Sequence, residues 1–250
     1  MTGTSRMTSQ EYRWLRILIL SIIPMLVLLT IFWGILAYSI PPIDGSISAQ
    51  DLAQHFRDHA VRLRLGYGVA VPAWGFSMLW SIGVYHIMRR VEGGQGILST
   101  VALIGGGLSV VPTSIASCLW VAAAYRPETD PAIVQMLYDT GWLTIGLFFS
   151  VTTFQCVAVG IVFLQDKRAV PLVPKWVAWL GIWAGLEFLV EIIMPQFRSG
   201  PFSWAGLFNY WLPFFVPFTW MTALSFYLYH ATRRLEAEDT ARTAGQGQAA

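Results

Sequence analysis

The chain has 250 residues, of which 55% are hydrophobic and only 12% are Asp, Glu, Lys or Arg. Soluble domains have roughly 25% charged residues, so one water-soluble core of this size cannot hide so much apolar surface. The net charge of +2 and the lack of a continuous basic patch exclude a nucleic-acid-binding protein. We therefore predict an integral membrane protein whose main partner is the lipid bilayer.

Six long apolar runs follow one another along the chain. Each holds the ~20 apolar residues that a helix needs to cross a hydrocarbon core of about 30 Å. Backbone groups in lipid are satisfied only in helices or closed barrels, and runs of this length favour helices. We predict an all-α bundle of six transmembrane helices, formed by residues 17–43, 65–88, 93–125, 140–165, 176–197 and 199–232, the last of which begins with a loop.

The positions of the basic residues predict the orientation of the bundle. With the N-terminus in the cytoplasm, eleven Lys and Arg lie inside and five lie outside, so the positive-inside rule places both termini in the cytoplasm. The first run is too long for the roughly 7–15-residue core of a signal peptide, so we interpret it as a retained helix. We expect a cytoplasmic segment 1–16, a transmembrane domain 17–232 and a polar tail 233–250. That tail is expected to be disordered, because it has too little apolar surface to bury.

The longest predicted loop, residues 41–64, contains a short helix. Ser48 and Asp51 have the spacing of a helix-capping box, and Leu52 and Phe56 then recur at helical spacing. This pattern predicts an amphipathic helix that lies on the outer surface of the bundle with an apolar underside.

The same short helix carries Asp51, His55 and His59 at intervals of four residues. Two histidines one turn apart can share a metal ion. Three ligands over two turns of a straight helix span about 12 Å, however, which is too far for all three to reach one ion. We therefore predict a solvated polar stripe and no metal site, with a His55–His59 metal pair as the weaker alternative.

Prolines interrupt four of the predicted spans. A proline inside a helix removes a backbone hydrogen bond and can kink the helix, and kinked helices near the bilayer midplane can form a substrate or ion site. Proline is also common in ordinary membrane helices, so both interpretations stay open. The prolines are Pro24, Pro72, Pro112, Pro213 and Pro217.

The fourth run has a polar stripe that should face protein or a cavity. Gly146, Ser150 and Thr153 recur on one face at helical spacing, and Asp139 precedes them. Asp139 lies at the predicted helix start, where a carboxylate interacts favourably with exposed backbone amides. A helix-capping role is therefore the favoured one for Asp139, and Asp139, Ser150 and Thr153 are candidate cavity residues.

Glu187 and Glu191 are the strongest candidates for a functional site, because they lie inside the otherwise charge-free run 176–197. An ionisable group in hydrocarbon costs about 2.5 kcal/mol or more, so such residues usually have a role. In an α-helix this spacing places both carboxyl groups on one face, about one turn apart, so we expect the pair to share a proton. A structural pair that hydrogen-bonds to neighbouring helices is the alternative.

Residues 198–213 read RSGPFSWAGLFNYWLP. This segment resembles a Gly-Pro-Phe-x-Trp-x-Gly-Leu motif that precedes the last, proline-containing helix in uncharacterised bacterial polytopic inner-membrane proteins. The resemblance covers this region alone; it implies a bacterial multi-pass membrane protein and carries no activity.

The same segment is predicted to be a turn-rich outer loop. Its aromatic side chains can either lie in the membrane interface or cover a cavity that contains Glu191. Trp204 and Asn209 are therefore candidate cavity residues, and Arg198 is a candidate counter-charge for the glutamates.

Three functions fit these features. The first is a proton- or cation-coupled carrier or binder of a small lipophilic molecule that uses the carboxyl pair. The second is an intramembrane enzyme in which a Glu is the general acid or base on a lipid-soluble substrate. The third is a structural or accessory membrane subunit in an oligomer or with a partner subunit. The chain lacks a P-loop, a Rossmann fingerprint and a serine-nucleophile elbow, so we expect no cofactor.

Overall fold

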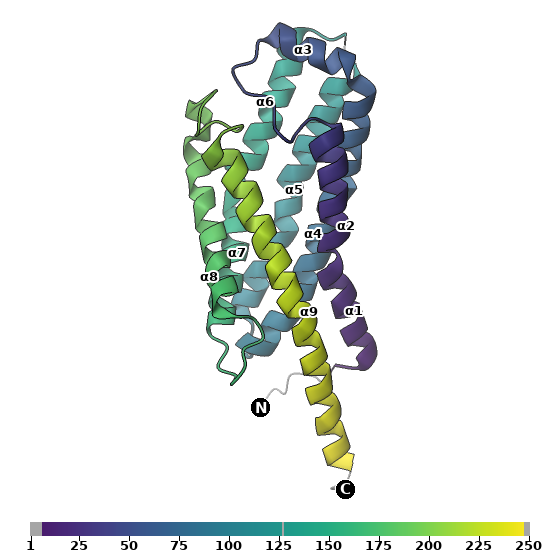
Figure 1. Cartoon of the computed structure of the whole chain (residues 1–250), viewed down its shortest axis with the longest axis vertical. Coiled ribbons are helices and arrows are strands. Elements are labelled where there is room, and N and C mark those ends of the chain that lie inside the picture. Colours follow the sequence, from purple (N-terminus) through teal and green to yellow (C-terminus); the bar gives the residue numbers. More distant parts are fainter. Residues whose placement is uncertain (1–6, 127, 248–250) are drawn as a thin grey trace.

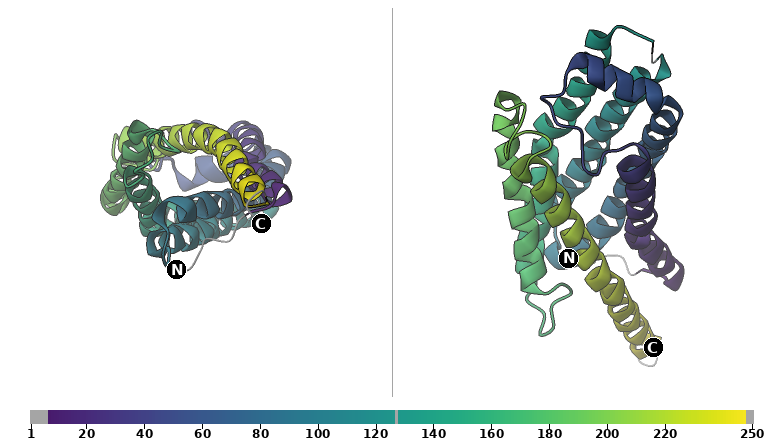
Figure 2. Two further views of the ribbon diagram at one scale, coloured as in Figure 1. Left: turned by 90° about the horizontal axis from the view of Figure 1, so that it is seen from below. Right: turned by 45° about the horizontal axis from the view of Figure 1, so that its top comes forward.

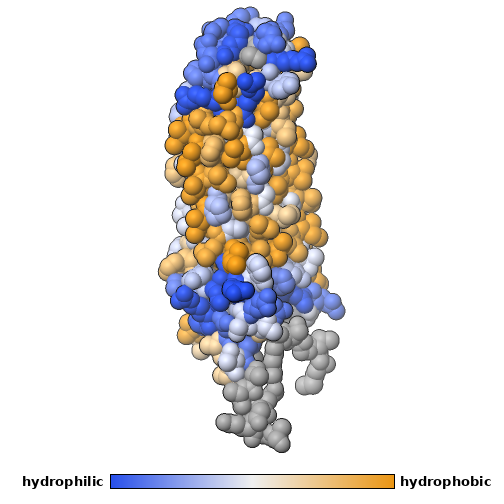
Figure 3. Space-filling model, turned by 90° about the vertical axis from the view of Figure 1, so that its right-hand side faces the viewer, coloured by the Kyte–Doolittle hydropathy of each residue, from blue (hydrophilic) through white to orange (hydrophobic). Residues whose placement is uncertain are grey.

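The computed structural model describes residues 7–126 and 128–247, and all regular secondary structure in them is helical. Six helical stretches in this part of the chain are long and apolar enough to cross a membrane, which confirms the predicted all-α bundle. A hydrophobic belt separates two hydrophilic ends of the molecule on the face drawn in Figure 3. The chain is thus a multi-pass membrane protein.

Several spans are built from more than one type of helix. The first consists of α1 (Ser9–Leu20), α2 (Ile22–Leu28) and the π-helix η1 (Leu29–Leu36); the second is α4 (Ala60–Glu92); the third is α5 (Ile97–Tyr125); the fourth consists of α6 (Pro131–Leu147) and α7 (Phe149–Leu164); the fifth consists of α8 (Lys175–Glu187) and the 3-10 helix η2 (Phe188–Gln196); and the sixth consists of the π-helix η3 (Leu207–Trp211) and α9 (Leu212–Gly247).

Both chain ends lie at one end of the bundle, and α3 (Ala49–Asp58) covers the other end (Figure 1). The helix α9 runs obliquely across one face of the bundle. It contacts α1 near the termini and approaches α8 toward the α3 end (Figure 2). Because α9 is tilted, it diverges from α2 toward the α3 end.

The short helix α3 forms as predicted. The Ser48 hydroxyl accepts a hydrogen bond from the Asp51 amide at 3.1 Å, which caps the helix. Leu52, Ala53 and Phe56 are buried on the side that faces the bundle. The prediction of an amphipathic helix at the end of the bundle is therefore confirmed.

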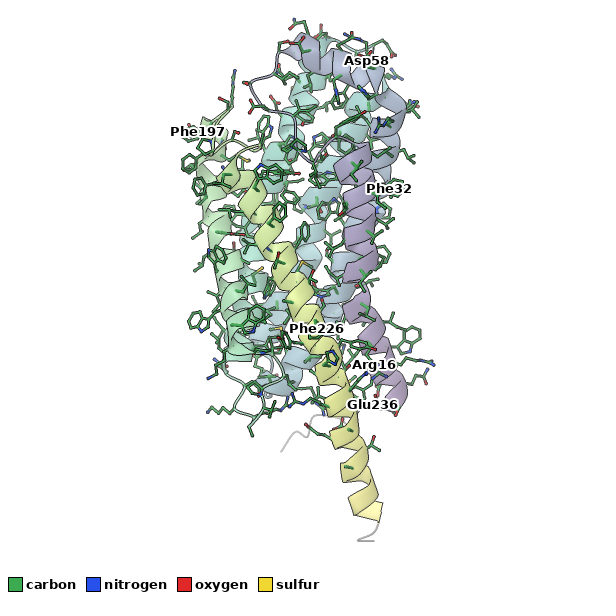
Figure 4. The ribbon with its side chains drawn as sticks, viewed as in Figure 1. Arg16, Phe32, Asp58, Phe197, Phe226 and Glu236 are labelled. Carbon is green, nitrogen blue, oxygen red and sulfur yellow. The ribbon has the colours of Figure 1, made fainter. Side chains whose placement is uncertain are left out.

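The tail that begins at residue 233 was predicted to be disordered, but the structure shows that α9 continues to residue 247. The side chains of Glu236 and Asp239 bond to other helices of the bundle. Asp239 accepts hydrogen bonds from Arg90 and from Tyr12, each at 2.8 Å, and Arg16 pairs with Glu236 at 2.7 Å (Figure 4). Composition alone missed these long-range partners, which offset the entropy lost on ordering the tail. Residues 248–250 lie outside the described part.

The first membrane helix also starts earlier than expected. We assigned residues 1–16 to a cytoplasmic segment, but α1 begins at Ser9. Thr8 and Glu11 form a reciprocal capping box at this start. Residues 9–16 are therefore part of the first helical span, and residues 1–6 lie outside the described part.

The fourth span begins well before the predicted start. Asp130 caps α6 by accepting a hydrogen bond from the Ala132 amide at 2.8 Å, and Pro131 occupies the first helical position. Proline is favoured there because it lacks only an N–H that would be unpaired anyway. Asp139 consequently lies inside the helix, and its predicted capping role is wrong.

Most departures from α-helical geometry lie toward the α3 end. They are η1, the break between α6 and α7 at Phe148, η2 and η3, whereas the break between α1 and α2 at Ser21 lies toward the termini. Figure 4 places Phe32 of η1 and Phe197, which follows η2, in this half, whereas Arg16 and Glu236 lie in the other half. The nine residues of η2 exceed the usual run of about 3–4 in a 3-10 helix, and such irregular turns often mark functional sites.

Candidate intramembrane binding site

A cavity of about 140 Å³ lies inside the bundle, and all six spans contribute to its lining. Aromatic and methionine side chains, such as Trp74, Trp142, Phe214 and Met194, form most of its wall. Its polar lining includes Ser109, Thr113, Thr152, Gln155, Asn209 and Glu191. An apolar pocket with a few convergent polar groups is the usual form of a small-molecule site.

Glu191 is the acidic side chain of this lining. It is only 4% exposed, and its Oε2 atom has no hydrogen-bond partner. Gly146, at the end of α6, makes room for the carboxyl group, because a Cβ at this position would lie 2.7 Å from Glu191 Oε2. The glycine on the predicted stripe of the fourth span therefore allows the acid to face the cavity.

Glu187 lies in a different environment from Glu191. It is the last residue of α8, and the chain then turns into η2. Four residues of a 3-10 helix rotate the side chain by about 120°, against about 40° in an α-helix. The two carboxyl groups are therefore not aligned as an α-helix would align them: Glu191 lines the cavity, whereas Glu187 is not among its lining residues. Both Glu187 oxygens are nevertheless buried without a hydrogen-bond partner.

Some polar groups around the cavity are already paired. The Ser109 and Thr152 hydroxyls lie 2.8 Å apart, and the Gln155 amide donates to the Ser81 hydroxyl at 2.9 Å. These contacts join α5 to α7 and α7 to α4. They hold the framework of the cavity. The Thr113 hydroxyl is also paired, because it donates to the Val110 carbonyl at 2.9 Å.

Two polar groups of the lining, in addition to the Glu191 oxygen, have no partner. They are the Nε1 atom of Trp74 and the Oδ1 atom of Asn209. A buried N–H or C=O group without a partner costs about 1–3 kcal/mol, so such groups are rare unless something binds them. The cavity thus presents one donor and one acceptor beside a carboxyl group.

Trp204 and Asn209 lie at the cavity, as we expected for the aromatic loop. The Trp204 ring is 5% exposed, and its Nε1 atom donates to the Ile43 carbonyl at 3.1 Å. The Asn209 Nδ2 atom donates to the carbonyl of Phe202. The loop is therefore held against the cavity by hydrogen bonds to backbone groups.

The other predicted cavity residues do not line this cavity. Thr153 is buried, but its hydroxyl donates to the Gly185 carbonyl of α8 at 2.9 Å. Asp139 is partly exposed, and Ser150 and Arg198 are exposed. The apolar run of the fourth span predicted a helix correctly. It did not predict which side chains face the cavity, because the break at Phe148 rotates α7 relative to α6.

Trp74, Trp142 and Met194 were missed by sequence reasoning. A signal was present for Trp74, which is in the interior of the run 65–88, whereas most membrane tryptophans lie at the interfaces. Trp142 gave no such signal, because the predicted run begins at residue 140 and places this indole near an interface. Three of the prolines, Pro112, Pro213 and Pro217, also line the cavity.

The two histidines of α3 lie together outside the cavity. The ring centroids of His55 and His59 are 4.6 Å apart, and His59 Nδ1 lies 3.0 Å from the His55 carbonyl. Among the described residues, no group of three His, Cys, Asp or Glu side chains is placed to hold a metal ion. The alternative metal pair therefore gains no third protein ligand in this part of the chain.

Comparison with known proteins gives no further guide to the site. No model of a protein family, no curated protein sequence and no solved structure matches the chain.

Proposed function

We propose that the protein binds a small lipophilic molecule inside the membrane and couples its binding to a proton or cation at Glu191. One observation carries this proposal: the Glu191 Oε2 atom is buried at a cavity without a partner. No Lys, Arg or His is among the described residues that line this cavity. A carboxyl group there is neutral unless a cation accompanies it, because an unpaired buried charge is very costly.

The size and lining of the cavity indicate the kind of ligand. A cavity of about 150 Å³ in another protein holds benzene, so a volume of about 140 Å³ suits a ligand of one ring. Aromatic faces such as those of Trp142 and Phe214 attract an organic cation. Glu191 would anchor an ammonium or hydroxyl group, and Asn209 and Trp74 offer further hydrogen bonds.

A carrier or binder fits these features better than the other two functions. The helices around Glu191 depart from α-helical geometry, and such segments in membrane proteins line sites that exchange a ligand. A purely structural carboxyl group would be expected to have hydrogen-bond partners.

We further propose that the protein lies in a bacterial inner membrane with both termini in the cytoplasm. The unequal distribution of basic residues and the resemblance of residues 198–213 support this assignment. Labelling of single cysteines at residues 44 and 243 of a cysteine-free variant in intact cells tests the orientation. A reagent that cannot cross the membrane should label only residue 44.

Fluorine NMR on the protein in lipid nanodiscs tests the binding function. The probes are para-fluorobenzylamine, para-fluorobenzyl alcohol and fluorobenzene, which are a cation, a neutral hydrogen-bonding molecule and an apolar molecule of the same ring size. We expect the amine to bind the native protein, and Glu191→Gln to weaken this binding about tenfold or more, equal to about 1.4 kcal/mol. Asp139→Asn is the control, because Asp139 does not line the cavity and should leave affinity unchanged.

Two further measurements narrow the role of Glu191. Glu187→Gln shows whether the two acids act together, since a matching loss of affinity would mean that they share one proton. In weakly buffered solution, the bound ammonium ion should displace about one proton from Glu191, which a pH indicator detects. If no probe binds to the native protein, the proposed function is wrong.

A further inference from the structure

A second hollow lies next to the first cavity, between the first span and α9. Its volume is about 640 Å³. Leu29 and Thr30 line the side formed by the first span, and Phe215, Thr219 and Thr222 line the side formed by α9. None of the described residues that line it is charged. We call this hollow the α2–α9 groove.

The α2–α9 groove faces the lipid. Phe215 is 62% exposed, and Thr30, Thr219 and Thr222 are also exposed. The groove lies where α9 diverges from α2 above the contact between α1 and α9 (Figure 1). Its lining residues belong almost entirely to membrane spans, so lipid and not water is next to it.

A single layer of aromatic side chains separates the groove from the cavity of Glu191. Trp74, Phe214 and Phe218 line both hollows. Trp33 supports this layer from the first span: its ring stacks on Phe214 at a centroid distance of 5.1 Å and meets Trp74 edge-on at 6.1 Å. The two hollows are therefore neighbours across one side-chain thickness.

This aromatic layer is held by ring contacts and not by hydrogen bonds of its indoles. The Nε1 atoms of Trp33 and Trp74 are buried without a partner. The other cover of the cavity is different, because Trp204 donates its Nε1 hydrogen to the Ile43 backbone at 3.1 Å. A rotation of Trp74 or Phe218 breaks no side-chain hydrogen bond, whereas moving Trp204 breaks one. A passing ligand with an acceptor atom would also satisfy the free indole N–H groups.

We infer that the α2–α9 groove is the lateral entrance through which the lipophilic ligand passes from the bilayer to the Glu191 cavity. Trp74, Phe214 and Phe218 form the gate of this entrance. The inference rests on the proposed binding function. It adds the route by which a molecule dissolved in lipid reaches a carboxyl group that lies behind the wall of the bundle.

Exchange kinetics of para-fluorobenzylamine in nanodiscs test this route. The double variant Thr30→Trp/Thr219→Trp places large rings on both exposed sides of the α2–α9 groove. Neither residue lines the Glu191 cavity. We expect the association and dissociation rates to fall together by about tenfold, while the dissociation constant changes by less than about twofold. The matched control is Ile31→Trp/Phe226→Trp, which adds the same rings at exposed positions outside the groove and should leave both rates unchanged.

A second variant tests the gate in the opposite direction. Phe218→Ala thins the shared wall, so exchange should become faster than in the native protein. Size-exclusion chromatography and circular dichroism establish that each variant is folded, and Phe218→Ala keeps the test decisive if the double variant does not fold. Unchanged exchange in these variants, with ligand still bound, overturns the lateral entrance and leaves the binding function intact. Absence of binding to the native protein overturns both.

Discussion

Asp239 and Glu191 are buried to nearly the same degree, 5% and 4% exposed, but their surroundings differ completely. Asp239 accepts hydrogen bonds from Arg90 and Tyr12, whereas Glu191 Oε2 has no partner. A buried carboxylate with such partners ties its helix to its neighbours. An unpartnered carboxyl group raises the free energy of the empty protein, and a ligand can recover that free energy.

The same contrast holds for the two halves of the bundle. Near the termini the first span is broken at Ser21 between α1 and α2, and ion pairs join α9 to α1 and α4. Toward α3 the chain changes between α, 3-10 and π geometry, and the buried indoles of Trp33 and Trp74 lack a partner. Unpartnered buried groups also occur elsewhere, at Trp220 and at Arg168, which lies beside Arg90. We propose that the ion pairs near the termini stabilise the bundle, whereas the unpartnered groups at the cavity lower its stability in favour of the proposed binding function.

The largest expected effect is the loss of the Asp239 contacts. Asp239→Ala leaves Arg90 without its partner in a setting where the two side chains are 13% and 6% exposed. Removing one partner of a buried ion pair costs about 3–5 kcal/mol. We expect the free energy of unfolding, measured by SDS titration in mixed micelles, to fall by this order. Glu236→Ala is the comparison, and it should cost less than about 1 kcal/mol because that pair is more exposed.

Substitution of Glu191 should raise the free energy of unfolding, whereas substitution of Asp239 should lower it. Glu191→Leu removes an unpartnered buried carboxyl group and replaces it with an apolar side chain of similar length. Because the desolvation cost of such a group is about 1–3 kcal/mol, the free energy of unfolding should rise by up to that amount while ligand binding is lost. The same SDS titration measures the change. A loss of stability as large as that of Asp239→Ala would mean that Glu191 is a structural residue, contrary to our proposal.

Gly146→Ala should separate binding from stability. The new Cβ would lie 2.7 Å from Glu191 Oε2 and 2.4 Å from Met194 Cε, which are both ends of side chains and can move. We expect an affinity loss of about tenfold for para-fluorobenzylamine, because the methyl group displaces the carboxyl group and fills the cavity. The free energy of unfolding should change by less than about 1 kcal/mol, since better helix propensity offsets the crowding.

Gly107→Ala is the matched control for Gly146→Ala. A Cβ at Gly107 meets nothing within 4 Å, and this residue does not line the cavity. Affinity should therefore stay unchanged. An equal loss of affinity in both variants would show that the loss comes from a general change in helix structure. It would not come from filling the space that Gly146 leaves for the Glu191 carboxyl group.

The sequence predicted the spans and the loop of this site better than the position of its acids. Apolar runs identify membrane helices because their length and composition are what the bilayer selects. Ser48 and Asp51 identified α3 because capping depends on a few neighbouring residues. The loop of Trp204 and Asn209 was likewise placed near Glu191 by chain order alone.

The rotation of Glu191 relative to Glu187 could not be predicted in this way. It depends on the switch from α8 to η2. Pro195 is a local sign of an interrupted helix, because a proline removes the hydrogen bond to the residue four positions earlier, here Glu191, but it does not specify the geometry that replaces the α-helix. Such switches arise where tertiary packing overrides local preference. The ordered tail was missed for a related reason, because the partners of Asp239 are more than 140 residues away in sequence.

The smallest expected effect concerns His55, a further unpartnered group in the α3 half. Its Nε2 atom is buried without a hydrogen bond, and the Tyr38 ring lies edge-on at 5.1 Å. Burial, together with the neighbouring His59, lowers the pKa of His55 below its ordinary value of 6.5, although Asp58 opposes the shift. The unfolded chain therefore binds the proton more readily, so the free energy of unfolding should fall as the pH drops through this value.

His55→Gln should reduce this pH dependence. Thermal unfolding in detergent between about pH 5 and pH 8 measures the slope, because only a histidine is expected to titrate in this range without a large shift. If His55→Gln keeps the full pH dependence of the free energy of unfolding, burial of His55 does not lower the stability of the α3 half. The contrast between the two halves would then rest on the cavity and its aromatic wall alone.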